Sequence, residues 1–296
     1  MERRDFLKFV SGGIILMPAL PHFLSSCSPR PLRFGMVTDA HYADRETHNN
    51  RFYRDSLAKM KDAMEKFNRS NLDFVIELGD LKDMGPDKDP KNALGFLDTV
   101  EKALQGFRGP VYHVLGNHDM DCLSKQEFLS HTSNPGNANG RSWYAFTCKG
   151  IRCIVLDANF NPDYSDYDRG NFHWTSAWIP PVEMEWLEAE LDASRGLPKI
   201  VFIHQMLDSF SDISPKLCVA NAEEVVSLLE RQPDILAVLQ GHHHPGHYSR
   251  RQGIQYYTLG GMIEGPYPEH NSYAIVEVRP DGSIEIQGFG DTESVK

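Results

Sequence analysis

The chain has few cysteines, no excess of basic charge and no long apolar run, and each absence excludes a class of protein. Its five cysteines among 296 residues are too few and too scattered to build a disulfide-dependent fold. Acidic residues outnumber basic ones by 41 to 30, so a formal net charge of −11 leaves no broad basic face for a general nucleic-acid binder. No apolar run reaches the roughly 18 residues of a membrane-spanning helix. With 41% hydrophobic and 24% charged residues, the composition is that of a globular protein rather than a disordered or fibrous one.

The first 27 residues have the order of an export leader. A short charged segment with paired Arg3 and Arg4 precedes an apolar stretch over 9–24, which is interrupted by glycines and prolines. The paired arginines resemble a twin-arginine signal, and Leu24-Ser25-Ser26-Cys27 resembles a bacterial lipobox. We therefore expect residues 1–27 to be a leader with Cys27 as the lipidation site, and 28–296 to form a single domain. The protein would be exported and anchored to a bacterial membrane by lipid alone, on the periplasmic side or at the cell surface. The alternative is an amphipathic start in which Cys27 is an ordinary buried thiol.

A hairpin is predicted around Lys149-Gly150. Its strands would place Cys148 opposite Ile151 and leave Cys153 diagonal to Cys148, roughly 7 Å away and too far for a good bridge. No obligatory disulfide is expected.

Short β-rich runs alternate with helical patterns from residue 33 onward, which predicts a layered α/β domain. Five of the runs are apolar, and polar side chains follow each of them closely. Because ligands bind outside the carboxyl ends of the strands in open α/β sheets, we expect these side chains to meet at one sheet edge. The runs and the residues that follow are 33–38 with Asp39 and His41, 73–78 with Asp80 and Asp83, 111–115 with Asn117, His118 and Asp119, 199–203 with His204, and 235–240 with His242, His243 and His244.

Other segments fill in the expected architecture. Helices are predicted over 51–68, 183–193 and 222–230, and further strands over 254–259, 272–278 and 283–288. The long, aromatic and turn-rich stretch 159–181 is predicted to be an elaborated surface loop.

The ordered set Asp-x-His, Gly-Asp-x-x-Asp, Gly-Asn-His-Asp, His and Gly-His-x-His resembles the calcineurin-like metallophosphoesterase superfamily. The resemblance covers residues 39–244 and implies an α/β/β/α sandwich with two divalent ions. Asp80 would bridge the two ions. One ion would be held by Asp39, His41, Asp80 and His244, and the other by Asp80, Asn117, His204 and His242.

The residue types themselves suit such a centre. Carboxylate, amide and imidazole donors without a thiolate favour Mn, Fe or Zn over a cysteine-built structural zinc site. One shared carboxylate holds two ions about 3.5–4 Å apart. An extended backbone over the three consecutive histidines would send His242 and His244 to one side and His243 to the other.

The expected chemistry is attack on phosphorus by a metal-activated hydroxide. His118 would stabilise the transition state or protonate the leaving oxygen, and Asp119 would orient His118. Two interpretations of Asp83 carry equal weight: a carboxylate that shapes the loop below the metals, or a plain turn residue.

The segment Tyr257-Thr258-Leu259-Gly260-Gly261-Met262-Ile263-Glu264 resembles the manganese-dependent ADP-ribose/CDP-alcohol diphosphatase branch of this superfamily. This resemblance implies a dinuclear-metal phosphoesterase that hydrolyses phosphoester or diphosphate bonds of small phosphorylated molecules, with nucleotide conjugates as expected substrates. The alternative is a broad-specificity exported phosphomonoesterase or phosphodiesterase. Two other classes fit less well. A non-catalytic binding protein would have lost one of the metal-ligating residues, and none is missing here. A mononuclear amide hydrolase would not need two sets of metal-ligating residues.

Substrate-binding residues and the oligomeric state are not assigned from the sequence. Arg51 and Arg54 are candidates for binding a second phosphate, although Arg54 falls within the predicted helix. The aromatic residues of the 159–181 loop either stack on a nucleobase or pack the loop onto the body of the protein. The aromatic residues considered for this role are Tyr164, Tyr167, Phe172, Trp174 and Trp178.

Overall fold

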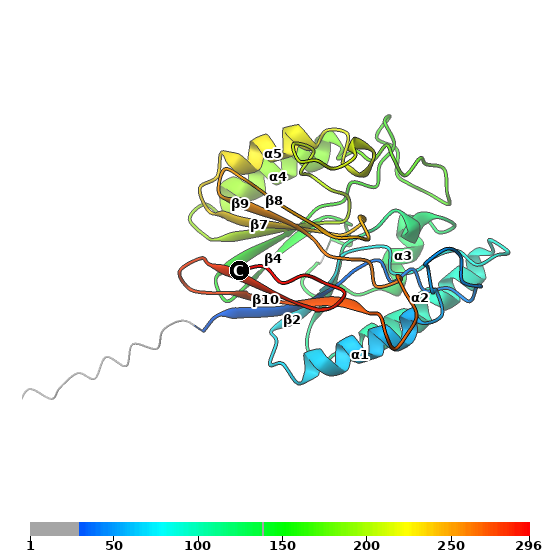
Figure 1. The fold of residues 1–296 in the computed structure, drawn as a ribbon. Helices are drawn as coiled ribbons and strands as arrows, with labels where there is room; N and C mark the ends of the chain where they lie inside the picture. The colour runs from blue at the N-terminus through cyan, green and yellow to red at the C-terminus, as the bar shows by residue number, and fades with distance from the viewer. Residues whose placement is uncertain (1–29, 138) are drawn as a thin grey trace, which may run out of the picture.

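The computed structural model describes residues 30–137 and 139–296. Two β-sheets pack face to face, and helices cover the outer face of each sheet (Figure 1). This is the predicted α/β/β/α sandwich, and the predicted fold class is confirmed. In the described part of the chain, no helix is both long enough and apolar enough to cross a membrane.

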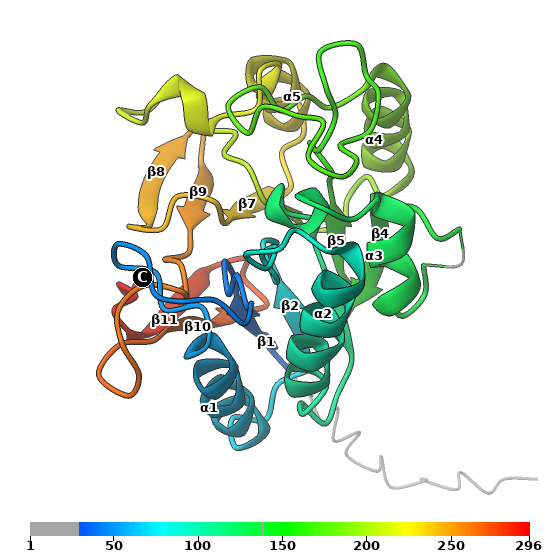
Figure 2. The same cartoon turned by 90° about the vertical axis from the view of Figure 1, so that its right-hand side faces the viewer.

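The first sheet has five strands in the order β11-β10-β1-β2-β3. Strands β1, β2 and β3 are parallel, and β10 pairs antiparallel with both β1 and β11. Helices α1 and α2 lie on its outer face (Figures 1 and 2). The bounds are β1 Leu32–Val37, β2 Phe74–Glu77, β3 Val111–His113, β10 Ser272–Val278, β11 Ile284–Gly290, α1 Ser56–Asn68 and α2 Pro90–Leu104.

The second sheet has six strands in the order β4-β5-β6-β7-β9-β8. Helices α4 and α5 cover its outer face, and a short helix α3 lies near the loop ends of both sheets (Figure 2). The bounds are β4 Tyr144–Cys148, β5 Ile151–Val155, β6 Lys199–Ile203, β7 Ile235–Gln240, β8 His247–Arg251, β9 Ile254–Thr258, α3 Lys125–His131, α4 Pro181–Ala193 and α5 Ala222–Glu230. Two single 3₁₀ turns, η1 His118–Met120 and η2 Pro215–Leu217, complete the elements.

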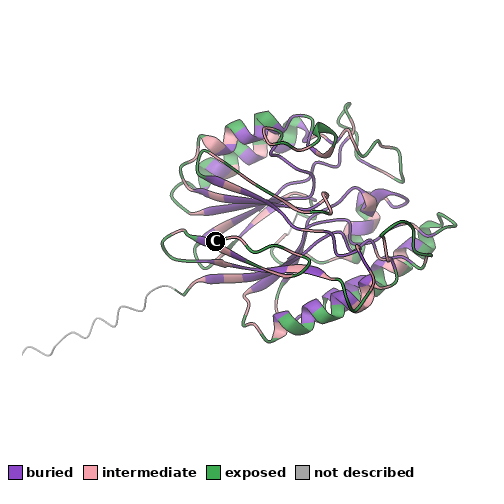
Figure 3. Ribbon diagram, in the orientation of Figure 1, coloured by how far each residue is buried: buried purple, intermediate pink, exposed green. Residues whose placement is uncertain are grey.

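An apolar layer between the sheets holds the sandwich together. Phe34 of β1 stacks on Phe74 of β2 with ring centroids 4.7 Å apart, and its ring meets the edge of Phe202 from the other sheet at 5.7 Å. All three side chains are buried, and Figure 3 shows burial along both sheets with exposure on the outer faces of the helices. Removing these surfaces from water is the main driving force for joining the two layers.

The predicted elements agree with the structure except at a few places. The 199–203, 222–230, 235–240 and 272–278 segments have the predicted bounds. The helix predicted from residue 51 begins only at Ser56, because Arg51 pairs in bridges with His48 and Glu264 instead. The Lys149-Gly150 hairpin is confirmed, with Cys148 opposite Ile151. Helices α2 and α3 and strand β8 were not predicted.

Candidate metal centre

Seven polar residues converge on the ends of β1, β2, β3, β6 and β7. Five of them are buried and two are partly buried, although all carry hydrogen-bonding or charged groups. They come from segments up to 205 residues apart, and Figure 2 views the molecule from the end where these strands finish. The residues are Asp39, His41, Asp80, Asn117, His204, His242 and His244.

Four of these residues have a backbone conformation that L-amino acids rarely adopt. The φ angles of Asp39, His41, Asp80 and His242 are 51°, 45°, 57° and 72°. A non-glycine residue in this region costs roughly 1–3 kcal/mol and persists only where the surroundings hold it, most often at functional sites. The extended backbone predicted through His242 is therefore wrong, although both His242 and His244 face the site.

Hydrogen bonds between the loops hold these strained turns. The backbone N–H groups of Asp39 and His41 donate to the carbonyls of Gly79 and Asp80 at 2.9 and 2.8 Å. The His242 N–H donates to Oδ2 of Asp39 at 3.0 Å. The loops after β1, β2 and β7 therefore form one interlocked unit.

A close backbone approach requires glycine at one of these loops. A Cβ on Gly116 would collide with the backbone nitrogen and the carboxylate of Asp80. Since Asp80 is buried, it has no room to move away. Gly116 therefore fixes the position of this carboxylate.

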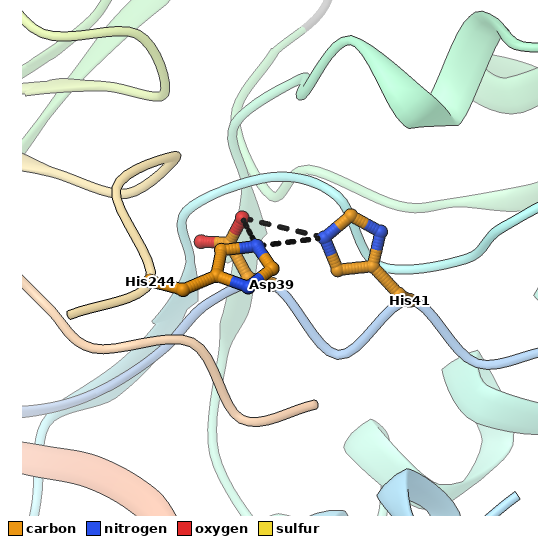
Figure 4. A group of neighbouring side chains, drawn as sticks. All are labelled: Asp39, His41 and His244. Atoms are coloured by element: carbon orange, nitrogen blue, oxygen red, sulfur yellow. Dashed lines mark hydrogen bonds and ion pairs between the residues drawn. The ribbon is translucent and has the colours of Figure 1, made fainter. Parts of the chain in front are cut away.

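Asp39, His41 and His244 form the first group of potential ligands (Figure 4). Oδ1 of Asp39 lies 3.5 Å from Nε2 of His41 and 3.2 Å from Nε2 of His244. The two Nε2 atoms are themselves 3.2 Å apart. Three donor atoms thus face a common point, which is the arrangement that a divalent cation needs.

Asp80, His204 and His242 form the second group. Oδ2 of Asp80 lies 3.2 Å from Nε2 of His204, which is 3.2 Å from Nδ1 of His242. The same oxygen lies 3.6 Å from Nε2 of His41, so Asp80 stands between the two groups. Asn117 is buried next to them, and its Oδ1 has no hydrogen-bond partner.

The chemistry of the donor set fits two divalent ions. Burial would raise the pKa of the Asp80 carboxyl, but the facing His204 and His118 imidazoles hold it well below its usual range. The carboxylate is therefore ionised, as a ligand must be. Burial, with the charge of neighbouring His204, lowers the pKa of His242 to about 3 and keeps its ring neutral. The Asn117 amide oxygen, which is buried without a partner, is costly unless a cation binds to it.

The second nitrogen of two histidine rings is fixed by a partner outside the donor set. Nδ1 of His204 donates to the Leu78 carbonyl at 2.8 Å, and Nδ1 of His244 lies 2.6 Å from Oε1 of Glu264. Such contacts set the tautomer and leave Nε2 free to bind a metal. Glu264 was predicted only as part of the tail motif, and its contact with His244 joins the tail to the first group.

His118 lies beside Asp83 rather than beside Asp119. Its Nδ1 is 3.5 Å from Oδ1 of Asp83, and Oδ2 of Asp83 is 3.7 Å from Nδ1 of His41. Burial would lower the pKa of His118, but the Asp80 and Asp83 carboxylates outweigh it and raise this pKa to about 8.

The Asp119 carboxylate accepts hydrogen bonds from the backbone N–H groups of Gly116, Asp80 and Leu81 at 2.9, 3.1 and 3.0 Å. This placement differs from the orienting role predicted for Asp119 and joins the loop after β2 to the loop after β3.

A cavity of about 540 Å³ opens over the two groups. Besides candidate ligands and His118, its walls include Arg51, Trp174 and Leu217. A cavity of about 600 Å³ between α4 and α5 has glutamates on its walls but none of the seven candidate ligands. Of these two cavities, the one above the strand ends is therefore the one lined by candidate metal ligands.

Comparison with known proteins agrees with this architecture. The chain belongs to the calcineurin-like phosphoesterase family, whose pattern matches residues 32–246. A dimetal phosphatase from Danio rerio has a similar structure, with a TM-score of 0.77 and 24% identity over 89% of this chain and 98% of that one. The prediction of a metal-dependent phosphoester hydrolase is confirmed at this level.

Curated relatives carry the name manganese-dependent ADP-ribose/CDP-alcohol diphosphatase. The protein from Xenopus tropicalis is 26% identical, covering 88% of this chain and 92% of its own length. The protein from Arabidopsis thaliana is also 26% identical, covering 92% of this chain and 98% of its own length. The predicted resemblance to this branch is confirmed.

The same relatives contradict the predicted localisation. They are a frog and a plant protein, whereas the lipobox is a bacterial signal. The prediction of an exported protein that is lipid-anchored to a bacterial membrane is therefore wrong. Cys27 and the other residues of the predicted leader lie outside the described residues.

Proposed function

We propose that this chain is a dinuclear-metal hydrolase that cleaves the diphosphate bond of small nucleotide conjugates and works best with manganese. The observation that carries the proposal is the position of the Asp80 carboxylate between two groups of imidazole and carboxylate donors. The names of the curated relatives support both the substrate class and the metal. The catalytic domain in this proposal is residues 28–296.

Asp80 would be the ligand shared by both ions. The first ion would be held by Asp39, His41, Asp80 and His244, and the second by Asp80, Asn117, His204 and His242. Two bound divalent ions supply Lewis-acid charge for the phosphoryl oxygens and lower the pKa of a water molecule towards neutrality.

His118 is assigned the proton transfer at the leaving oxygen. It lines the cavity and its side chain is 30% exposed, so it can reach a substrate while its Nδ1 lies 3.5 Å from the Asp83 carboxylate. Because Nδ1 faces the carboxylate, we assign the proton transfer to Nε2. Asp83 is a positioning residue in this assignment, and Asp119 stabilises the loop that presents His118.

Arg51 favours a diphosphate over a simple monoester. A nucleotide conjugate has a second phosphate beyond the scissile one, and this group needs a cationic partner. Arg51 provides that cation in the wall of the cavity that contains Asp80 and Asn117. Arg54 instead forms ion pairs with Asp44 and Glu46 at 2.6 and 2.7 Å on the surface.

The test is a substrate panel run on protein stripped of metal and reloaded with Mn, Fe or Zn. ADP-ribose and CDP-choline are compared with cyclic nucleotides, p-nitrophenyl phosphate and bis-p-nitrophenyl phosphate. We expect metal-dependent hydrolysis of the two conjugates, with the highest kcat/KM in manganese. A monoester preference above about 100-fold, or roughly 2.7 kcal/mol of transition-state discrimination, would overturn the diphosphatase assignment.

A further inference from the structure

Trp174 is an exposed indole in the wall of the cavity that contains the candidate metal ligands. Trp174 is 47% exposed, which leaves much of a large apolar ring in contact with water. The centroid of its ring lies 5.9 Å from that of His242, and the two planes are inclined at 58°. The indole therefore has exposed surface beside the second group of donors.

The other aromatic residues of the 159–181 loop have packing partners. Tyr167 and Phe172 stack with centroids 4.0 Å apart, and Tyr164 meets the edge of Trp178 at 6.1 Å. Phe160, the sixth aromatic side chain of this described loop, packs against Trp143 with ring centroids 6.0 Å apart. Of these six, only Trp174 lines the cavity. Both sequence interpretations therefore apply, because five rings pack the loop and one faces the site.

The backbone next to Trp174 is anchored, so its position is not that of a loose loop tip. The carbonyl of the preceding residue, His173, accepts hydrogen bonds from the Ser176 N–H at 2.9 Å and from the Tyr167 hydroxyl at 3.3 Å. Tyr167 is fully buried. A ring presented by an anchored backbone loses little conformational entropy when a ligand binds to it.

We propose that Trp174 stacks on the nucleobase of the substrate and is the residue that selects nucleotide conjugates over other diphosphates. This inference rests on the proposed diphosphatase function. Leu217 lines the same cavity and adds apolar surface, while Arg51 provides the charge for phosphate. The cavity therefore offers both a cationic and an aromatic wall, as a phosphate joined to a planar group requires.

A quaternary ammonium group could also sit on an indole face. Next to the second group of donors, however, two divalent ions would outweigh the charges of Asp39 and Asp80 and leave this wall positive. A neutral base is therefore favoured over the choline end of a CDP-alcohol at this position.

The experiment measures kcat/KM of manganese-loaded Trp174→Ala for ADP-ribose, CDP-choline and a dialkyl diphosphate that has the same bond but no base. Stacking on an aromatic side chain is worth roughly a 5- to 150-fold effect per base. We expect a loss of this size for both nucleotide conjugates, mainly in KM, and a change below about threefold for the dialkyl diphosphate. Trp174→Phe should recover most of the loss, because a phenyl ring retains a stacking face.

Tyr164→Ala is the matched control, since Tyr164 is 43% exposed in the same loop but packs against Trp178. It should leave all three substrates unchanged. An equal loss on all three substrates in Trp174→Ala, or a loss confined to CDP-choline, would overturn the proposal. A wild-type enzyme that cleaves none of the diphosphates would instead refute the proposed function, so the two failures are distinguishable.

A binding measurement without turnover completes the test. Titration of the unreacting nucleosides adenosine and cytidine should quench tryptophan fluorescence in the wild type and not in Trp174→Phe. Equal quenching in both proteins would place the base elsewhere.

Discussion

The imidazole of His118 lies 3.5 Å from the carboxylate of Asp83, which follows a different strand. Asp83 is 2% exposed and also accepts the backbone N–H of Met84 at 2.8 Å. A buried carboxylate next to an imidazole fixes the orientation of the imidazole ring. Replacing the carboxylate with an amide of the same shape removes only the charge and tests this function. We expect Asp83→Asn to lower kcat by roughly 10-fold or more on esters with poor leaving groups. Metal content and KM should stay the same, and a lower metal content would show instead that Asp83 supports the ligands.

His118 itself should be catalytic without being a ligand. His118→Ala is expected to retain its metal while losing roughly 10²–10⁴ in rate, the usual scale for a positioned acid or base. The loss should shrink for p-nitrophenyl esters, because a good leaving group needs little protonation. Rates over a series of leaving groups measure this dependence. A loss that is constant along the series would mean that His118 stabilises charge rather than transfers a proton.

Asp119 should matter for stability more than for chemistry. Its carboxylate accepts hydrogen bonds from four backbone N–H groups, and each buried donor left without a partner costs about 1–3 kcal/mol. Asp119→Ala should therefore lower the free energy of unfolding by several kcal/mol and release metal, because three of these donors belong to the Asp80 loop. Urea unfolding and metal analysis measure both effects. A fully stable, metal-loaded variant with slow turnover would restore the catalytic assignment.

The meeting of the candidate ligands at one sheet edge could be predicted because each follows an apolar run. Asp39, Asp80 and His204 come within three residues of the ends of buried strands, and parallel strands place their carboxyl ends at one edge. The partner of His118 could not be predicted in this way. In the folded chain the Asp119 carboxylate is bound by backbone N–H groups, and Asp83 is the carboxylate that lies 3.5 Å from the ring.

Residues from irregular segments were also difficult to assign. Trp174 lies in a loop without a repeating pattern, and the contact of Glu264 with His244 depends on a turn after β9. Helix α2 had a detectable signal that the prediction missed. Asp89 accepts the Lys91 N–H at 2.9 Å and Pro90 occupies the first turn, which together mark a helix start.

Asp80 should be needed for both ions, and Asp39 for one. Asp80→Ala is expected to leave fewer than one ion per chain and no turnover, since Oδ2 of Asp80 faces both groups of donors. Asp39→Ala removes a donor from the first group only and should retain about one ion. Elemental analysis after gel filtration counts the ions, with exposed Asp44→Ala as the control that retains both. Two ions in Asp80→Ala would contradict the bridging assignment.

His113 and Glu101 should make the stability of the protein depend on pH. Nε2 of His113 lies 2.8 Å from Oε2 of Glu101, and both side chains are buried between β3 and α2. Burial would lower the pKa of His113, but the Glu101 carboxylate outweighs it and raises this pKa above its ordinary 6.5. Burial likewise would raise the pKa of Glu101, yet facing His113 lowers it below 4.5.

The two shifts define a window of greatest stability. Since the His113 pKa is raised in the folded state, its contribution is complete below pH 6.5 and is lost as the pH rises through the folded pKa. The Glu101 contribution is present above pH 4.5 and is lost as the pH falls through its lowered folded pKa.

His113→Gln leaves a buried carboxylate without its cationic partner and should cost about 3–5 kcal/mol near pH 6. The cost should decrease as the pH rises through the folded pKa of His113, because the wild-type pair then loses the charge on the imidazole. Urea unfolding of both proteins across this range measures the difference, with the surface variant Glu65→Gln as a control that removes an exposed pair with Arg69. A destabilisation that is the same at every pH would show that His113 and Glu101 form a neutral hydrogen bond rather than an ion pair.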